Sequence, residues 1–479
     1  MFFPSLRRLA QKDFDAWGYH IQWPQNQILS PLTGKVDFVV EDIKFAYNAW
    51  SLLRLAMFFG VKHPKVLSNM TTTTPSMDIM LSGNRLFFMH SHVKAHLNQS
   101  KVRIALTPNH PRAFPVQELV WETHCRFHDR QSAGVQLVLG MENGLSQEVV
   151  DACNLCTYIP QYGSVGSLSM LSALAIAAHS TWRAVVREDG TTFHTSLAFH
   201  DPSHGHMPLS NSPDRVRHSL PHEMNLLGCS NAAIKALLEE RRRTYDLQVS
   251  VLIYNELGDR NIGAVIRNAN VFNCEYVAIV NRRRFNRRGA IGTHKVMNVL
   301  FFDTVNDDAA RQRFEGYEVW LLYPYYPNLV MYEAEGKEDA SSNSSTFVRH
   351  EDPVLQAWGA TQHQLTSEHP LVVLYPHLCQ QTVFLDDDRS LASCVQDVKR
   401  RKLRGILLAV PEEGCSPHPC FCKLSHRVVY VTSPSFLPHQ TQRGLNPALS
   451  TAIALERLRC AVDSLCLTSW PNGPGSHCV

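Results

Sequence analysis

The chain has 479 residues, enough for two or three domains, and its 44% apolar and 19% charged content is that of a soluble globular protein with a sizeable core. No run of 18 uncharged apolar residues occurs, so no membrane-spanning helix is expected. The formal net charge of +3 neither favours nor excludes nucleic acid, because a local basic patch can hide in a near-neutral total.

The N-terminal segment "MFFPSLRRLAQK" contains Arg7, Arg8 and Lys12 before the first acid, Asp13. A basic, acid-poor start is typical of a mitochondrial targeting segment, and an ordinary basic N-terminus is the alternative. We interpret residues 1–34 as an N-terminal extension and expect a mitochondrial location. Thirteen cysteines without framework spacing indicate reduced thiols, as in an intracellular protein.

Internal repeats organise the rest of the chain. Three pairs of segments match in the same order: 46–61 with 259–274, 137–146 with 407–416, and 167–177 with 444–454. The first pair places an arginine six residues after an asparagine, and the second shares Glu-x-Gly-x-Ser after an apolar run. The third pair aligns without gaps and ends in Ala-Ile-Ala. Three ordered matches predict two copies of one domain.

The domain boundaries follow from composition. We expect a first domain at 35–187, a linker at 188–224, a second domain at 225–462 and a tail at 463–479. The linker is rich in Pro, Ser, His and Asp and has no apolar period. The second copy is longer, and its excess falls largely at about 333–400, where "EAEGKEDASSNSS" is a polar low-complexity stretch.

Short strands and helices alternate within each copy. In the second copy, "SNAAIKALLEERRR" predicts a helix that begins at a Ser/Asn cap. "VSVLIYN", "YVAIVN" and "EVWLLYP" are apolar runs rich in β-branched residues and bounded by polar turns, so they predict buried strands. This alternation indicates βαβ units, and hence an α/β fold with parallel sheets covered on both faces.

The repeated motifs resemble those of the SpoU/TrmH branch of the SPOUT RNA methyltransferases. That family has Asn-x-Gly-x-x-x-Arg as motif 1, a strand followed by Gly-x-Glu and a glycine as motif 2, and Ile-Pro…Ser-Leu-Asn before a helix as motif 3. The segment "NRRRFNRRGAIGTHK" also resembles the region after motif 1. The resemblance touches both copies. It implies two α/β domains, each with a trefoil knot, paired as a pseudo-dimer within one chain.

The resemblance also implies S-adenosylmethionine as cofactor, bound between the loops at 140–144 and 159–168. Glycine allows backbone to approach a ligand closely where a side chain would block it. The implied cofactor residues are Leu139, Gly140, Gly144, Ile159, Gln161 and Leu168. The implied catalytic residues are Asn48, Arg54, Glu142, Ser167, Asn261 and Arg267. Arginine is a poor general base because its pKa is so high. Stabilising the charge of a developing alkoxide is the role that suits its chemistry. The copy that supplies the catalytic arginine is left open.

Both copies depart from the family pattern. The first has Trp50 in place of the motif 1 glycine and Ser169 in place of the motif 3 asparagine. The second has Val410 in place of the motif 2 glycine and Gly444 in place of the motif 3 serine. Because a β-branched side chain would crowd the cofactor slot, we expect one working pocket, in the first copy.

Two functional hypotheses follow. The first is an RNA ribose 2′-O-methyltransferase, and the second is an inactive relative that binds RNA as a ribosome assembly factor. In either case the expected partner is structured RNA, such as ribosomal RNA or a ribosomal particle, and further protein partners stay open. No membrane partner is expected.

A dense arginine cluster favours RNA contact. Arginine forks suit phosphates, and the aromatic Phe285 can stack on an unpaired base, although many charge runs are only solvated faces. The residues proposed to bind RNA are Arg282, Arg283, Arg284, Arg287, Arg288 and Lys295.

Two cysteine groups are weighed as metal sites. Cys153 and Cys156 form a C-x-x-C without a second pair, so a buried helix end is favoured. The cluster "CSPHPCFC" at 415–422 matches no common zinc-finger spacing, so a metal-free loop is favoured over zinc. We expect no metal.

Overall fold

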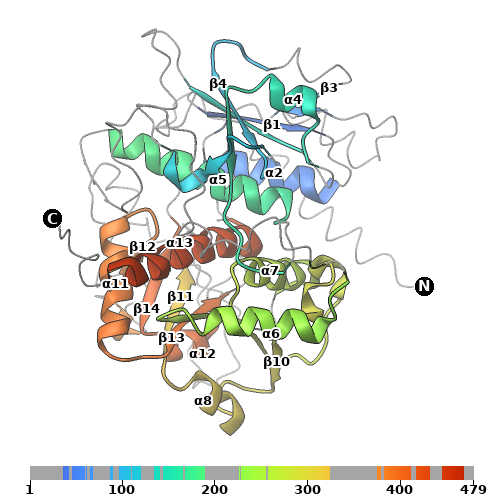
Figure 1. The fold of residues 1–479 in the computed structure, drawn as a ribbon. Helices are drawn as coiled ribbons and strands as arrows, with labels where there is room; N and C mark the ends of the chain where they lie inside the picture. The colour runs from blue at the N-terminus through green and yellow to red at the C-terminus, as the bar shows by residue number, and fades with distance from the viewer. Residues whose placement is uncertain are drawn as a thin grey trace, which may run out of the picture. The chain divides into compact units, whose positions relative to one another are not determined.

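The computed structural model describes residues 36–41, 46–59, 61, 65–67, 87–89, 97–108, 110–119, 134–140, 144–164, 168–188, 226, 228–254, 257–323, 375–378, 382–411, 417–431 and 445–468. The chain forms two compact units, whose elements are labelled in Figure 1. Unit 1 comprises Met1–Ile159, Ala173–Thr192 and Ser433–Leu445, and unit 2 comprises Pro160–Ser172, Phe193–Thr432 and Asn446–Val479. A short segment between two elements of unit 1 therefore belongs to unit 2.

Unit 1 is built on a seven-stranded sheet with the order β3-β2-β1-β6-β4-β7-β5. Its strands are β1 (Val36–Glu41), β2 (Lys65–Leu67), β3 (Phe87–Met89), β4 (Val102–Leu106), β5 (Phe114–Pro115), β6 (Val135–Leu139) and β7 (Leu155–Tyr158). Its helices are α2 (Ala46–Phe58), η2 (Val116–Glu118), α4 (Gln147–Asp151) and α5 (Met170–Glu188), the last of which starts in unit 2.

Unit 2 has a second seven-stranded sheet with the order β10-β9-β8-β13-β11-β14-β12. Its strands are β8 (Gln248–Tyr254), β9 (Val277–Val280), β10 (Val299–Phe302), β11 (Tyr317–Tyr323), β12 (Thr382–Phe384), β13 (Gly405–Val410) and β14 (Arg427–Tyr430). Its helices are α6 (Asn231–Arg242), α7 (Asp259–Val271), η5 (Arg287–Ala290), η6 (Thr293–Lys295), α8 (Asp308–Phe314), η7 (Pro376–Leu378), α11 (Asp388–Arg400), α12 (Pro419–Leu424) and α13 (Pro447–Thr468).

The two sheets have the same strand order when β1 to β7 are matched in sequence to β8 to β14. Neighbouring strands are parallel throughout both sheets. β9 and β13 are buried along their whole length, as parallel strands covered on both faces should be. The predicted α/β fold with parallel sheets is confirmed, and so are the strands predicted at β8, β9 and β11.

The helix predicted from "SNAAIKALLEERRR" is α6, and its predicted cap is present. The Ser230 hydroxyl accepts a hydrogen bond from the Ala233 backbone N–H at 3.1 Å. Such a cap satisfies one of the backbone donors that have no partner within the first turn. The Ser/Asn start that was predicted for this helix is therefore confirmed.

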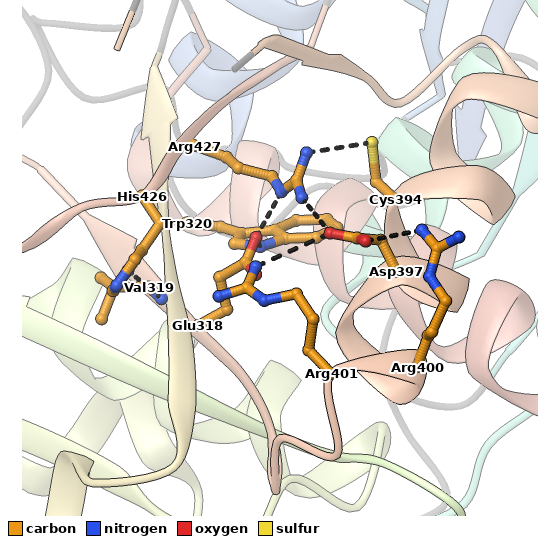
Figure 2. A network of polar contacts seen from close by, with 9 residues as sticks. All are labelled: Glu318, Val319, Trp320, Cys394, Asp397, Arg400, Arg401, His426 and Arg427. Carbon is orange, nitrogen blue, oxygen red and sulfur yellow. Dashed lines mark hydrogen bonds and ion pairs between the residues drawn. The ribbon is translucent and has the colours of Figure 1, made fainter. Parts of the chain in front are cut away.

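A buried ionic network joins β11, β14 and α11 near the amino-terminal ends of the two strands (Figure 2). The Glu318 side chain is 1% exposed and accepts hydrogen bonds from Arg401, Arg427 and the Trp320 indole. Arg427 also donates to Asp397 at 2.8 Å, so one guanidinium bridges two carboxylates. Because a buried carboxylate is costly without partners, this network fixes how the three elements pack.

The predicted domain boundaries stay predictions. Residues 1–34, 189–224 and 324–374 lie outside the described part of the chain. From Pro376 to Arg400, the predicted insertion forms η7, β12 and α11. Among the described residues, no helix is both long enough and apolar enough to cross a membrane.

Candidate active site

A tight turn follows β6 in unit 1. A Cβ placed on Gly140 would lie 2.2 Å from the Gly144 carbonyl oxygen and 2.6 Å from the Leu145 nitrogen. Gly144 has φ +77°, in the left-handed region that favours glycine. Both glycines are therefore required by the turn itself. The close neighbour of Gly140 is backbone of its own turn, whereas the resemblance implied a ligand.

An acid that the sequence analysis did not single out supports the same turn. Glu41, at the carboxyl end of β1, accepts hydrogen bonds from the Ser146 N–H and hydroxyl, each at 3.2 Å. Ser146 immediately precedes α4. The signal available in the sequence was an acid that ends an apolar run, just before motif 1.

The motif 1 residues lie on equivalent helices. In unit 1, α2 carries the half-buried Asn48 and the buried Arg54. In unit 2, α7 carries Asn261 and Arg267, both half-buried. Burial lowers the pKa of Arg267, although an arginine remains charged near neutral pH.

Within unit 2, the motif 1 arginine meets the segment that contains motif 3 of the first copy. Arg267 donates from Nη2 to the Leu168 carbonyl oxygen at 3.1 Å. Leu168 is buried, and it belongs to the Pro160–Ser172 segment. The structure thus brings together one predicted catalytic residue and one predicted cofactor residue, from different copies.

Asparagines join motif 1 and motif 3 of the second copy. Asn446 donates from Nδ2 to Asn261 Oδ1 at 2.9 Å, and its own Oδ1 accepts the Ala448 N–H at 2.8 Å. Asn268 donates to the Ala448 carbonyl oxygen at 2.7 Å. The start of α13 is therefore held against α7 by hydrogen bonds.

Ser169 and Asn446 occupy matching positions, and both cap a helix. Ser169 Oγ accepts the Ser172 N–H at 3.0 Å at the start of α5, just as Asn446 caps α13. Serine and asparagine are both good N-caps. The departure from the family pattern at Ser169 therefore keeps its structural role.

Val410 and Gly140 also occupy matching positions, but here the two copies differ. Val410 is the last residue of β13, pairs with Ile253 and is 1% exposed. Its side chain is packed in the second unit, at the position where the first unit needs a glycine for its turn.

Gly163 and Gln161 lie in the loop at 159–168, one of the two loops that the resemblance assigns to the cofactor. The Gln161 Oε1 is shielded from solvent and accepts no hydrogen bond from the residues that the structure describes. An unpaired buried carbonyl costs free energy, so a donor such as an adenine amino group would satisfy it. A Cβ on Gly163 would lie 1.8 Å from the Asn270 carbonyl oxygen. The unpaired Gln161 oxygen fits a ligand donor, whereas Gly163 is required by the close approach of α7.

The cofactor residues proposed from the resemblance fall in both units. Leu139 and Ile159 are buried and belong to unit 1, as do Gly140 and Gly144, whereas Gln161 and Leu168 belong to unit 2. Glu142, Ser167, Glu412 and Gly444 lie outside the described residues, as does the side chain of Trp50. The roles of all these residues stay predictions.

The glycine of the second motif 1 allows α7 to approach η5. A Cβ on Gly263 would lie 2.7 Å from the Ala290 nitrogen and 2.8 Å from the Gly289 Cα. Because η5 belongs to the arginine-rich segment, this glycine places that segment directly against the motif 1 helix.

The arginine cluster divides into inward-bound and exposed members. Arg282 is half-buried, forms an ion pair with Asp259 and donates to the Leu257 carbonyl oxygen at 3.1 Å. Arg283 is exposed and paired with Asp303 at 2.7 Å. Arg284, Arg287 and Lys295 are exposed, and the Arg288 side chain lies outside the described part. The exposed members form the better RNA candidates.

The cysteine groups show no metal geometry within the described ranges. There, no three His, Cys, Asp or Glu side chains gather as metal ligands, and Cys415 lies outside those ranges. His418 Nδ1 lies 3.0 Å from Cys420 Sγ. Burial raises the pKa of Cys153 to about 12 and also raises that of Cys156, so both stay thiols near neutral pH. The expectation of no metal stays an expectation.

Sequence comparison finds two matches to RNA methyltransferases. Residues 35–179 match the SpoU rRNA Methylase family. A tRNA (guanosine(18)-2′-O)-methyltransferase of Borreliella burgdorferi (strain ATCC 35210 / DSM 4680 / CIP 102532 / B31) is 24% identical over 160 residues, which cover 32% of this chain and 69% of the relative. Over its first copy, the chain is therefore similar to SpoU/TrmH-like methyltransferases.

Solved structures of methyltransferases are similar at low TM-scores. A probable methyltransferase from Bordetella pertussis Tohama I has TM-score 0.28 and 11% identity, covering 46% of this chain and 99% of its own. The SpoU methyltransferase AviRb from Streptomyces viridochromogenes has TM-score 0.26 and 13% identity, covering 46% and 61%. The AdoMet-bound rRNA methyltransferase from Sinorhizobium meliloti has TM-score 0.25 and 17% identity, covering 32% and 58%.

Proposed function

We propose that this chain is an S-adenosylmethionine-dependent RNA ribose 2′-O-methyltransferase with a single working pocket in its first copy. The observation that carries the proposal is the family match over residues 35–179, the segment that contains the Gly140–Gly144 turn. The relative from Borreliella burgdorferi is named as a 2′-O-methyltransferase, which supports the same reaction.

The single pocket is supported by the contrast at matching positions. Gly140 has no side chain and lies in a tight turn, whereas Val410 carries a buried β-branched side chain at the matching position of the second copy. The identical strand orders support two copies of one domain. A trefoil knot in each copy and their pairing as an intramolecular pseudo-dimer are part of this proposal.

In this mechanism, S-adenosylmethionine when bound supplies an electrophilic methyl group. The protein has to hold the ribose 2′-hydroxyl in line with that methyl, and positioning of this kind can supply much of the rate. The unpaired Gln161 Oε1 would orient the adenine edge. Arg54 or Arg267 would stabilise the negative charge that develops on the ribose oxygen as its proton passes to water. Glu142 and Ser167 would shape the site beside them.

Structured RNA is the proposed partner. Arg284, Arg287 and Lys295 are exposed beside the motif 1 helix, where they can contact phosphates. We propose ribosomal RNA as the target because the matched family is described by rRNA methylation, although the curated relative is named for tRNA. The basic N-terminus supports a mitochondrial location as a further proposal.

An inactive assembly factor is the second candidate. Trp50 in motif 1 and Val410 in motif 2 favour it, because both replace a glycine of the family pattern. The retained cap at Ser169 favours the enzyme instead.

Methyl transfer tests the proposal. The purified chain would be incubated with methyl-labelled S-adenosylmethionine and protein-free ribosomal RNA, with tRNA in parallel. We expect label at a ribose 2′-oxygen of one RNA class. RNA binding without any label in either RNA, in the presence of bound cofactor, would favour the assembly factor.

A further inference from the structure

A short stretch of the cofactor loop is docked on the end of α7 within unit 2. The backbone N–H of Tyr162 donates to the Val271 carbonyl oxygen at 2.7 Å. The Tyr162 side chain is buried, although its segment lies between β7 and α5 in the sequence. The loop is therefore attached to α7 through its backbone.

The ring of Tyr162 enters a socket lined by two arginines. The guanidinium carbons of Arg241 and Arg459 lie 5.5 Å and 5.7 Å from its centroid. Arg459 is itself fixed, because its Nε and Nη2 donate to the Phe272 carbonyl oxygen at 3.2 Å and 3.1 Å. Burial, and then the Asp463 carboxylate, raise the pKa of Tyr162, so the hydroxyl stays neutral. Residues of α6, α7 and α13 therefore form the socket around the ring.

The two residues that follow Tyr162 pack directly against α7. The Cβ of any residue at 163 would overlap the Asn270 carbonyl oxygen, at 1.8 Å. Ser164 donates from its hydroxyl to Asn270 Oδ1 at 3.2 Å. Only glycine lets the loop approach α7 this closely.

A second contact fixes the loop further along. Arg267 donates to the Leu168 carbonyl oxygen at 3.1 Å. Arg267 and Val271 are four residues apart on α7, so the two attachment points lie one helical turn apart. Gln161, whose buried Oε1 has no partner among the described residues, directly precedes Tyr162.

We propose that Tyr162 is a positioning residue that locks the cofactor loop onto α7, with Arg267 as the second attachment. This inference rests on the proposed function, since it assigns the anchored loop to S-adenosylmethionine. The second copy then serves as a support, because its motif 1 helix, α7, orders the loop of the first copy. Gln161 is held ready for the cofactor only while Tyr162 is seated.

The test uses three variants of the full chain. Gly163→Ala inserts one methyl group against the Asn270 carbonyl, and Arg267→Ala removes the second attachment. Gly258→Ala is the matched control, because a Cβ on Gly258, at the start of the same helix, has nothing within 4 Å. Amide hydrogen exchange of peptides covering 160–169 reports loop order without cofactor, and calorimetry with S-adenosylmethionine reports binding.

We expect Gly163→Ala and Arg267→Ala each to speed exchange across 160–169, and to weaken S-adenosylmethionine binding by about tenfold, as loss of one hydrogen bond can. Exchange in β8 and β13 should stay at the wild-type rate in all three variants, which shows that unit 2 is folded. Gly258→Ala should match wild type in both measurements.

Unchanged loop exchange in Gly163→Ala would overturn the anchor. Faster exchange with unchanged cofactor affinity would overturn the positioning role. If the wild-type chain binds no S-adenosylmethionine, the proposed function and the positioning role fail, while the exchange data still decide whether the loop is anchored.

Discussion

Arg267 donates from Nη2 to the Leu168 carbonyl oxygen at 3.1 Å, and this bond joins motif 1 of the second copy to motif 3 of the first. A guanidinium that holds a loop carbonyl fixes the position of that loop through its backbone. Because a guanidinium carries several N–H donors in a planar fork, holding a carbonyl and stabilising a phosphate or an alkoxide are compatible roles.

Substituting each motif 1 arginine in turn tests which of them holds the loop. Arg267→Ala should raise the S-adenosylmethionine dissociation constant by about tenfold, the effect of removing one hydrogen bond, and should also lower the methyl-transfer rate. Arg54→Ala, on α2 of unit 1, should leave exchange in the 160–169 loop unchanged. Calorimetry and single-turnover methylation measure the two effects. If Arg267→Ala changes neither quantity, the arginine has no part in the site.

The turn after β6 makes a prediction about stability. Gly140→Ala forces a Cβ to within 2.2 Å of the Gly144 carbonyl, so the turn has to open. We expect a loss of about 3 kcal/mol in the free energy of unfolding, because the crowded neighbour is backbone, and loss of cofactor binding. Gly144→Ala is the control: a Cβ there has nothing within 4 Å, but φ +77° costs about 1 kcal/mol. Chemical denaturation measures both. Equal losses would contradict the backbone contact.

The exposed arginines predict a salt effect. Arg284→Gln with Arg287→Gln should make the slope of log affinity against log salt shallower by about 0.7–0.9 for each phosphate that the variant no longer neutralises. Arg311→Gln, an exposed arginine on α8, is the control. Fluorescence anisotropy with a labelled RNA at several salt concentrations gives the slopes. An unchanged slope in the double variant would show that these side chains form only a solvated face.

Arg282 should behave differently from its neighbours. Its ion pair with Asp259 and its bond to the Leu257 carbonyl hold the loop before α7. We expect Arg282→Gln to lower the melting temperature while leaving the salt slope near its wild-type value. A melting temperature equal to that of wild type would contradict the structural role.

The network in Figure 2 gives a prediction about buried charge. Glu318→Gln removes the carboxylate that balances Arg401 and Arg427, and it leaves a half-buried guanidinium without that partner. Breaking a buried pair on one side costs about 3–5 kcal/mol, so the second unit should unfold at lower denaturant concentration. A loss below about 1 kcal/mol would show that solvent screens this ion pair, as it does for ion pairs on a protein surface.

Asp397 makes the same network sensitive to acid. Arg400 first, and then Arg427 and Arg401, lower the pKa of its carboxyl below the ordinary value. A depressed folded pKa adds stability that is fully present above the unfolded pKa of about 3.9, and that is lost as pH falls through the folded value. The stability difference between wild type and Asp397→Asn should therefore be present at neutral pH and shrink below about pH 4. A difference independent of pH would contradict this.

Local sequence signals were enough to predict β8, β9, β11, α6 and the parallel α/β class, because β-branched runs and a serine cap act within a few residues. The turn glycines Gly140 and Gly144 could be recognised from the sequence for the same reason, because they follow an apolar run within a few residues. Strands of two or three residues, such as β5 and β12, carry no period of their own.

The contacts between distant segments were not visible in the sequence. Nothing near Tyr162 signals that it docks on Val271, and nothing near Glu318 signals Arg427. Such pairs are set by tertiary packing. Motif matching named Arg267 and Leu168 separately, but only the structure shows that they are bonded.

The number of S-adenosylmethionine molecules bound per chain tests the central claim most directly. Isothermal titration of the full-length protein should give one site, and that site should disappear in Gly140→Val while remaining in Val410→Gly. Two sites per wild-type chain would contradict the single pocket. The absence of binding at millimolar cofactor would contradict the enzyme and favour the RNA-binding assembly factor.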